Sequence, residues 1–521
     1  MAHDEDPRSA GREGGTLTAS DPQVPPAAAD GTAAPARSLG QQAMRGAAVT
    51  ILGQGGRVVL QMASVVVLAR LLAPSEFGLM AMVLLFVGLG EVFRDFGLSS
   101  AAIQAPSLSR EQRDLLFWTN TGIGVILALA IFAGAGLIAA LFGQPELVGI
   151  AQALSVTFVF NGMATQYRAG LNRQMKFRAL AVVSVGGQAV GLVAAVVTAV
   201  LGAGYWALVA QQVAVAAGTL LLFLLFARWI PGPPRRGVPI RHFFRYGWQL
   251  MATQLVGYAA NNTDNLIIGL RFGVDSLGLY NRAFQLLMNP LNQLRTPATT
   301  VALPVLSRLQ DDDDRFAAFV VRAQLILGFT IVPALAVGAG VATPLVDVLL
   351  GAQWYAAAPL FAAIAIAGIF HMLAFVGYWV YLSRALTGPL LQFTIVAFVI
   401  RVACIGIGSQ WGLIGVAVGY ALEPALTWPL SLWWVSRYAP LPLRALWWGA
   451  GRALMVATAA AAAAWATVTL GIPDLPAIVQ LLLGSIAGIA VYAIAALHPR
   501  LRADLTIVVG AARVILRRRG H

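Results

Sequence analysis

Charged residues are scarce in this chain of 521 residues: they make up 11% of the sequence, against 59% for hydrophobic residues. A typical soluble domain carries about 25% charged residues. This scarcity and the mean hydropathy of +0.76 exclude an ordinary soluble protein. The apolar runs average about 20 residues, the length at which a helix spans a bilayer. The alternation over about ten residues that marks a membrane β-barrel is absent from the sequence.

Cysteine and lysine are almost absent. Cys404 is the single cysteine, so the chain can form neither an internal disulfide framework nor a cysteine metal cluster. It lies in an apolar run and is predicted to be a small core residue. Lys176 is the single lysine, and its sequence context excludes the Gly-Lys-Ser/Thr phosphate loop of an ATPase. We therefore expect no metal site and no cofactor.

The first 40 residues also lack the apolar segment that a signal peptide needs. They are rich in Ala, Pro, Gly, Asp and Ser, a composition with too little apolar surface to build a core. We expect residues 1–40 to form a disordered cytoplasmic tail.

The rest of the sequence predicts an all-α polytopic integral membrane protein with about fourteen transmembrane helices. Each predicted helix coincides with one apolar run that is long enough to cross the bilayer. The predicted spans are 47–72, 79–103, 115–142, 146–168, 179–201, 205–229, 244–270, 277–305, 316–342, 357–383, 388–408, 413–436, 446–470 and 475–497.

Arginine supplies nearly all of the net charge of +13, and it occurs in alternate loops. In a soluble protein this excess would suggest nucleic acid binding, but here the rule that cytoplasmic loops collect arginine explains it. Both termini are therefore predicted to be cytoplasmic, with no nucleic acid partner. Only Arg70 and Arg271 approach the outer side. The predicted outer loops without arginine are 143–146, 202–204, 343–356, 409–412 and 471–474.

The sequence contains an internal repeat. PSEFGL at 74–79 corresponds to VDSLGL at 274–279, and two further pairs of segments match: LFGQPEL at 141–147 with LLGAQWY at 349–355, and GYWALVAQQ at 204–212 with QWGLIGVAVGY at 410–420. Six helices separate the copies, so the repeats are predicted to be parallel, with substrate bound between them. The predicted parts are an N-terminal six-helix lobe at 41–235, a C-terminal six-helix lobe at 236–440, two additional helices at 441–498 and a basic cytoplasmic tail at 499–521.

The first two helices of each repeat carry stripes of polar residues, whereas the other spans are mostly apolar. Polar side chains in a membrane span are expensive unless they pair or line a wet cavity. We therefore predict a hydrated cavity between the lobes, with an excess of arginine that suits a phosphate-bearing substrate. The predicted cavity residues are Arg57, Gln61, Glu91, Arg94, Asp95, Asn261, Asn262, Asp264, Asn265, Arg282, Asn289 and Arg295.

Glu91, Arg94 and Asp95 share one helix face because their spacing is i, i+3, i+4. Arg94 can satisfy one of the two carboxylates, which leaves two hypotheses open for the other. It is either a proton carrier or a lock that pairs with Arg57 on the first helix. A structural role for the whole cluster, in which the charges neutralise each other, also stays open.

Three polar residues stand alone in apolar runs of the second half. His371 and Arg401 are predicted to be buried groups whose hydrogen bonds are satisfied. Glu423 precedes Pro424 and predicts either an ion site or a helix kink.

Several motifs resemble the bacterial polysaccharide-exporter flippases of the multidrug/oligosaccharidyl-lipid/polysaccharide superfamily. The similarity covers roughly residues 40–440. It rests on RLLAPSEFGLMAM and the following GLGEVFRDFGLSSAAIQ, on LFW at 116–118, on GYWALVAQQ, and on NNTDNLIIGLRFGVDSLGLYNRAFQLL at 261–287.

The resemblance implies two lobes around a central cavity. It also implies movement of polyprenyl-pyrophosphate-linked oligosaccharide across the inner membrane, for lipopolysaccharide or exopolysaccharide synthesis. Such a flippase acts beside a polysaccharide polymerase and glycosyltransferases, and it is a transporter and not an enzyme. Two alternatives remain. One is a cation-coupled drug antiporter of the same superfamily, and the other is a membrane-embedded polysaccharide polymerase, which the short, nearly uncharged outer loops disfavour.

Overall fold

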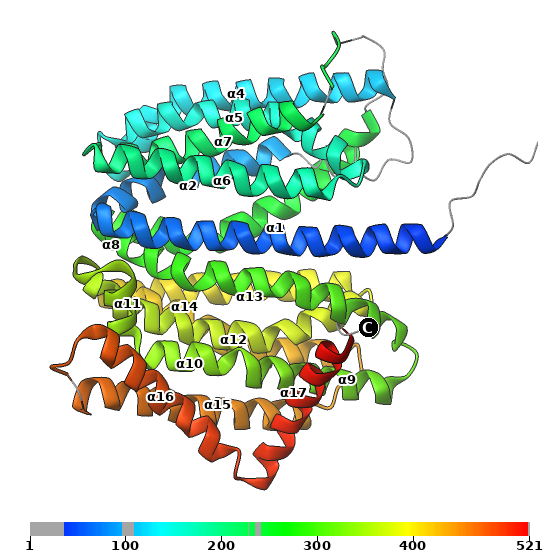
Figure 1. The fold of residues 1–521 in the computed structure, drawn as a ribbon, viewed down its shortest axis with the longest axis vertical. Coiled ribbons are helices and arrows are strands. Elements are labelled where there is room, and N and C mark those ends of the chain that lie inside the picture. The colour runs from blue at the N-terminus through cyan, green and yellow to red at the C-terminus, as the bar shows by residue number, and fades with distance from the viewer. Residues whose placement is uncertain (1–35, 96–108, 228, 235–240, 472, 519–521) are drawn as a thin grey trace, which may run out of the picture. The chain divides into compact units, whose positions relative to one another are not determined.

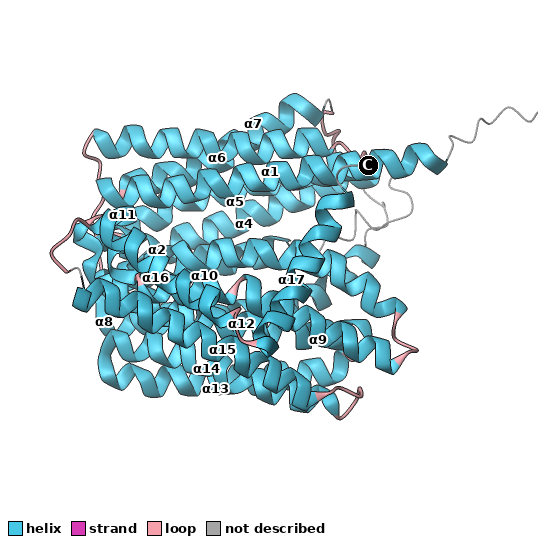
Figure 2. Ribbon diagram, turned by 60° about the horizontal axis from the view of Figure 1, so that its bottom comes forward, coloured by secondary structure: helices cyan, strands magenta, loops and turns pink. Residues whose placement is uncertain are grey.

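The computed structural model describes residues 36–95, 109–227, 229–234, 241–471 and 473–518. Internal contacts divide the chain into Met1–Arg45 and Gly46–His521, and the description below concerns the second unit. All regular elements in the described ranges are helices (Figures 1 and 2).

Each described helix of the first half overlaps a predicted span, and most of those of the second half do too; residues 96–103 of the predicted span 79–103 lie outside the described residues. The first half contains α1 (Ala36–Leu71), α2 (Pro74–Asp95), α4 (Arg110–Phe142), α5 (Leu147–Arg173), α6 (Phe177–Val200) and α7 (Trp206–Ala227). The second half begins with α8 (Arg241–Arg308), α9 (Asp313–Thr330), α10 (Val332–Gly340), α11 (Ala342–Leu350) and the 3-10 turn η1 (Ala352–Ala357). It continues with α12 (Ala358–Ser383), α13 (Thr387–Gly408), η2 (Ser409–Trp411), α14 (Gly412–Ser436), α15 (Leu443–Ala466), η3 (Thr467–Gly471), α16 (Ala477–Ala495) and α17 (Pro499–Arg518).

Eleven stretches within the described residues are long and apolar enough to cross a membrane, so the chain is a multi-pass membrane protein. One of these stretches, Thr387–Ser436, contains both α13 and α14. The polar helix α8 is not among them. The total of fourteen spans therefore stays a prediction.

The long helix α8 is two helices joined at a kink. Gly273 has φ 77° and ψ −167°, values that only glycine adopts without strain. The two arms correspond to the predicted spans 244–270 and 277–305. The two arms on either side of Gly273 thus carry the two polar stripes of the second repeat.

One predicted span of the second half is broken. The sequence predicted a single helix at 316–342, but α9 ends at Thr330 and α10 starts at Val332. Pro333 at the start of α10 has no backbone N–H to continue the α9 hydrogen-bond pattern. The predicted outer loop at 343–356 is also wrong as a loop, because α11 and η1 occupy it.

Most helices of the first half, α1 to α7, pack on one another, and so do most of those of the second half, α8 to α17; we call these groups the N-terminal and C-terminal lobes, and the predicted lobe boundaries stay a prediction (Figure 1). In the N-terminal lobe α4 packs on α5, and α6 packs on α7. In the C-terminal lobe α12 and α13 both pack on α14. The main contact between the lobes is α2 against α8, which brings the two copies of the repeated hexapeptide together.

At this contact the two repeats touch reciprocally. A Cβ added to Gly78 would overlap the backbone carbonyl of Val274, and one added to Gly278 would overlap the carbonyl of Pro74. Positions 74 and 274 are equivalent in the repeat, as are 78 and 278. When position i of one repeat contacts position j of the other, and position j of the first contacts position i of the second, the two repeats are related by a two-fold axis. This geometry supports the predicted pairing of the halves.

Backbone conformations repeat as well. Met175 and Ala385 are the non-glycine residues with positive φ, 52° and 54°, in the described ranges. At each site the following residue donates its amide to a carbonyl one turn back, at 3.0 and 2.8 Å. These turns share no sequence motif, so the sequence did not predict their equivalence. Glycines with positive φ also occur at corresponding positions, Gly143 with Gly351 and Gly204 with Gly412, although ψ differs between Gly143 and Gly351, at 30° and 167°.

The end of α1 is tied to the C-terminal lobe beside this crossing. The indole of Trp354 donates to the carbonyl of Ala69 at 2.7 Å, and the amide of Gln353 donates to the same oxygen at 2.5 Å. Arg70 donates to the carbonyl of Val348. Arg70, an exception to the arginine pattern of the loops, thus has a structural role as a tie between the lobes.

The predicted basic tail contains the helix α17. Its apolar residues Leu501 and Leu505 pack with α9 and α15. Arg452 of α15 donates two hydrogen bonds to the carboxylate of Asp504, at 2.7 and 3.0 Å. This bidentate pair fixes α17 to the bundle.

Candidate functional site

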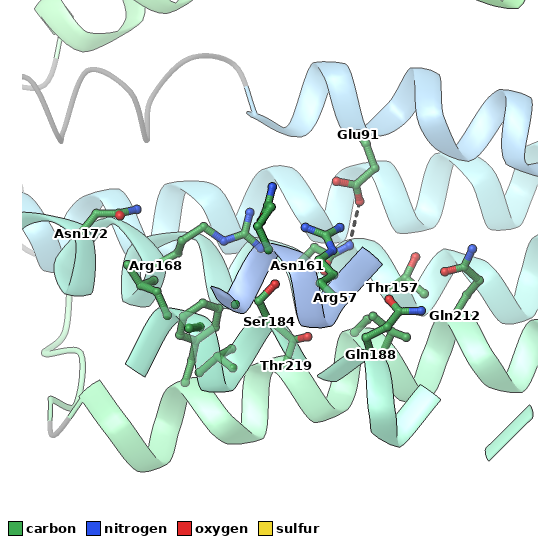
Figure 3. A pocket seen from close by; sticks show the side chains of 18 of the residues that line it. Arg57, Glu91, Thr157, Asn161, Arg168, Asn172, Ser184, Gln188, Gln212 and Thr219 are labelled. Carbon is green, nitrogen blue, oxygen red and sulfur yellow. Dashed lines mark hydrogen bonds between the residues drawn. The ribbon is translucent and has the colours of Figure 1, made fainter. Parts of the chain in front are cut away.

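A cavity of about 640 Å³ lies inside the N-terminal lobe. Its walls come from α1, α2, α5, α6 and α7, and Figure 3 shows their polar side chains directed into one space. The polar lining residues are Thr50, Gln54, Arg57, Glu91, Thr157, Asn161, Arg168, Asn172, Ser184, Gln188, Gln212 and Thr219.

Glu91 is held at the cavity wall by two neighbours. The guanidinium Nε of Arg94 donates to its carboxylate at 2.6 Å. The side-chain amide of Asn161 donates to the other oxygen at 3.0 Å, the bond drawn as a dashed line in Figure 3. Arg94 also donates to the hydroxyl of Thr165 at 2.7 Å. Of the Glu91 side chain, 28% remains exposed, so one face of this carboxylate is available to the cavity.

The charged groups that line the cavity give it a cationic excess. Arg57 on α1 and Arg168 on α5 face the same space as Glu91 (Figure 3). Glu91 already takes part in the ion pair with Arg94. Guanidinium groups bind phosphate oxygens in pairs of hydrogen bonds. Around them, amides and hydroxyls offer the donors and acceptors that sugar hydroxyls require.

The structure brings only some of the predicted site residues to this cavity. Arg57 and Glu91 line it, and Arg94 supports Glu91 from behind. Gln61 and Asn289 are half-buried and are not among the lining residues. The side chain of Asp95 lies outside the described residues. The predicted role of these residues in binding substrate remains a proposal.

The predicted residues of α8 lie in separate settings. Asp264 is buried and accepts a hydrogen bond from the Tyr280 hydroxyl at 2.6 Å. Arg282 is 7% exposed, with its guanidinium 3.5 Å from the ring centre of Phe77 across the lobe contact.

The other four α8 residues bond locally or within the C-terminal lobe. Asn262 and Asn265 make hydrogen bonds along their own helix. Arg295 donates to the carbonyl of His371 at 3.4 Å and lies over Phe375. The side-chain oxygen of Asn261 accepts a hydrogen bond from Arg401 of α13.

Sequence reasoning missed an ion pair in the C-terminal lobe. Arg401 of α13 donates to a carboxylate oxygen of Glu423 on α14 at 3.1 Å, and it also donates to the side-chain oxygen of Asn261 at 3.1 Å. Thr427 donates to the other Glu423 oxygen at 3.0 Å. Opposite charges in two consecutive predicted spans were the signal that could have identified this pair. The predicted satisfaction of Arg401 by hydrogen bonds is confirmed, although its side chain is 14% exposed and therefore only partly buried.

Comparison with known proteins identifies the family. A sequence model of a family described as "Polysaccharide biosynthesis protein" matches residues 67–359, more than half of the chain. The chain belongs to this polysaccharide biosynthesis family. The family resemblance found in the motifs is therefore confirmed.

Curated relatives of this polysaccharide biosynthesis protein extend over most of its length. It is 26% identical over 392 residues to the lipopolysaccharide biosynthesis protein WzxC of Escherichia coli (strain K12), covering 74% of this chain and 78% of the relative. It is 23% identical to the teichuronic acid biosynthesis protein TuaB of Bacillus subtilis (strain 168), covering 64% of this chain and 70% of the relative. It is 26% identical to the succinoglycan biosynthesis transport protein ExoT of Rhizobium meliloti (strain 1021), covering 61% and 64%.

Solved structures share the fold of this polysaccharide biosynthesis protein. The lipid II flippase MurJ in an inward closed conformation superposes with a TM-score of 0.64 at 15% identity, covering 87% of this chain and 99% of MurJ. An inward-facing MATE family transporter of the MOP superfamily gives 0.61 at 16% identity, covering 75% and 95%. The fold is therefore that of the multidrug/oligosaccharidyl-lipid/polysaccharide superfamily.

Proposed function

We propose that the protein is a flippase that moves lipid-linked oligosaccharide repeat units across the bacterial inner membrane. The observation that carries the proposal is the polar, arginine-bearing cavity among helices that otherwise present apolar surfaces. A cavity of this kind shelters sugars and phosphate from lipid, which is the energetic barrier to flipping. Membership of the polysaccharide biosynthesis family and the transport role named for ExoT point to the same function.

The proposed mechanism is alternating access, and the position of the contacts between the lobes supports it. Gly78 with Gly278, and Trp354 with the end of α1, hold the lobes together at the predicted outer end. In this state substrate enters from the inner leaflet, its phosphate bound by Arg57 and its sugars by the surrounding amides. Separation of the outer contacts then releases it to the other leaflet while the polyprenyl tail stays in lipid.

A deletion strain tests this function directly. It should accumulate a lipid-linked oligosaccharide in the inner leaflet, and the wild-type gene should clear it. Identifying the sugars of the intermediate names the substrate. If no such lipid accumulates and the strain becomes sensitive to cationic drugs instead, the protein is an antiporter and the flippase proposal fails.

Glu91→Gln should lower export about tenfold or more with little change in thermal stability. The amide keeps a hydrogen-bonding side chain at the cavity wall. Arg94 loses its charged partner, but a partly exposed ion pair of this kind is worth only about 0–1 kcal/mol, whereas the net charge of the cavity lining changes by one unit. Export is measured in the complemented deletion strain, and stability by thermal unfolding of the purified protein. Glu146→Gln, an exposed carboxylate outside the cavity lining, is the control. Full export by Glu91→Gln would exclude both a proton-carrying and a charge-setting role.

The proposed topology places both termini in the cytoplasm. With Cys404 replaced by alanine, single cysteines at Gly202 and Gln410 should react with an impermeant thiol reagent in intact cells. Cysteines at Arg173 and Arg178 should react only after the membrane is opened, because arginine-rich loops stay inside. Labelling of the second pair in intact cells would contradict the topology.

A further inference from the structure

A second pocket lies at the other side of the N-terminal lobe, between the start of α4 and the end of α5. Its volume is about 400 Å³. The seven residues that line it, all within the described ranges, include three arginines and no carboxylate: Arg110, Arg113, Gln166, Ala169, Gly170, Arg173 and Gln174. None of them lines the large cavity.

One lining residue is buried without a partner. Gln166 is 1% exposed, and neither its side-chain nitrogen nor its oxygen has a hydrogen-bond partner in the described structure. Such a group is costly to bury, and nearly all buried amides in proteins are hydrogen-bonded. The amide of Gln166 therefore has an unused donor at the wall of a pocket that arginines surround.

Arg113 is held in place for binding. Its guanidinium lies 4.1 Å from the ring centre of Trp229, and its buried Nε has no hydrogen-bond partner in the described structure. The nearest carboxylate in the sequence, Asp114, lies against Gly232 and not in the pocket. The pocket also sits at the first turn of α4, where the capping box of Ser109 and Gln112 satisfies two backbone amides, so this helix end contributes the positive end of its dipole.

We propose that this pocket binds the phosphate or pyrophosphate group of a lipid headgroup. Guanidinium groups, a free amide donor and a helix N-terminus together match the acceptor oxygens of phosphate. The pocket lies at the arginine-rich end of the helices, where the headgroups of the inner leaflet are expected. Two lipids offer this chemistry, a polyprenyl-pyrophosphate carrier and an anionic phospholipid. Binding needs no transport, so the site stands or falls independently of the flippase proposal.

The test measures binding to the purified full-length protein in phosphatidylcholine nanodiscs. Inorganic pyrophosphate, farnesyl pyrophosphate and phosphatidylglycerol are the probes, read by thermal shift and by native mass spectrometry. Wild-type protein should bind at least one lipid probe. Arg113→Gln and Gln166→Met should weaken that binding tenfold or more. Gly170→Leu should block it, because an added side chain at Gly170 meets open space in the fold and projects at the pocket wall.

The control is Arg178→Gln, which removes an exposed arginine near the same membrane end outside this pocket. Retained binding in the control with loss in Gln166→Met supports a specific site, since Gln166→Met changes no charge. Tighter binding of farnesyl pyrophosphate identifies the carrier lipid as ligand, and tighter binding of phosphatidylglycerol identifies a phospholipid. Absence of binding by all three probes, or equal loss in the control, would overturn the proposal.

Discussion

Gly78→Ala should reduce export to a tenth or less and lower the stability of the protein by about 1–3 kcal/mol, the cost of overpacking a well-packed contact. The added methyl group would overlap the carbonyl of Val274. The obstructing atoms belong to the backbone, so no rotamer change can relieve the overlap. The lobes must separate at the crossing of α2 and α8, which favours the state that is open at the outer end.

The reciprocal geometry makes a sharper prediction for the double variant. Gly278→Ala overlaps the carbonyl of Pro74 at the same crossing, so one separation of the helices relieves both overlaps. The effects of Gly78→Ala and Gly278→Ala should therefore be strongly non-additive, with the double variant little worse than either single.

A matched control lies on α8 itself. Gly257 is a helical glycine with no atom near an added Cβ, and Gly257→Ala should be neutral or stabilising because alanine favours the helix. Thermal unfolding and export by the complemented deletion strain provide the measurements. Full additivity in the double variant, or normal export by Gly78→Ala, would show that the crossing does not limit the transport cycle.

The crossing of α2 and α8 also shows which features of the fold could be predicted from the sequence and which could not. The repeated hexapeptide predicted that the halves are equivalent, because glycine and its apolar neighbours recur in the same order. It could not predict that the two copies touch each other. The equivalence of the turns at Met175 and Ala385 could not be predicted for another reason. The positive φ recurs at these two positions, but the residues there are different.

Only part of the candidate site could be predicted, because the sequence does not show which helices become neighbours. Helical periodicity identifies which face of α2 is polar, but not which neighbouring helix that face meets. Glu91 and Arg94 meet Asn161 and Thr165 of α5, within one lobe, and not the partner lobe. The residues of α5, α6 and α7 that complete the cavity are scattered polar positions in apolar runs, and only the packing brings them together.

For residues 499–521 the sequence analysis predicted only a basic cytoplasmic tail, and no helix. Apolar residues at positions 501, 505 and 508 have helical spacing, and this pattern could have predicted α17. Asp504 is the decisive residue, because its pairing with Arg452 holds the helix against the bundle. A single acidic residue in a basic segment gives no indication of its partner from sequence alone.

Breaking the Arg401–Glu423 pair in the C-terminal lobe should have the largest effect on stability. Their side chains are 14% and 6% exposed. Removing one partner of a buried pair leaves the other charge uncompensated, at a cost of about 3–5 kcal/mol. We therefore expect Arg401→Met or Glu423→Met alone to lower the thermal unfolding temperature sharply and to reduce the amount of folded protein in the membrane.

Removing both charges should restore most of the loss. In the double variant Arg401→Met with Glu423→Met no charge is buried, and replacing a whole buried pair with apolar residues of similar volume is often neutral. The hydrogen bonds of Arg401 to Asn261 and to the carbonyl of Ala260, and that of Thr427 to Glu423, are then missing. The recovery is measured as the coupling energy of a double-mutant cycle by thermal unfolding in detergent. A double variant no more stable than the singles would show that the pair does not act through charge compensation.

The pair at the large cavity gives the matched comparison, because water can reach it. Glu91 is 28% exposed against 6% for Glu423, and solvent screening makes exposed ion pairs worth only about 0–1 kcal/mol. Glu91→Gln should thus lower stability far less than Glu423→Gln while reducing export more per unit of stability lost. Equal stability losses in the two lobes would mean that the cavity of the N-terminal lobe is closed to water, and the loading site of the proposed flippase would have to lie elsewhere.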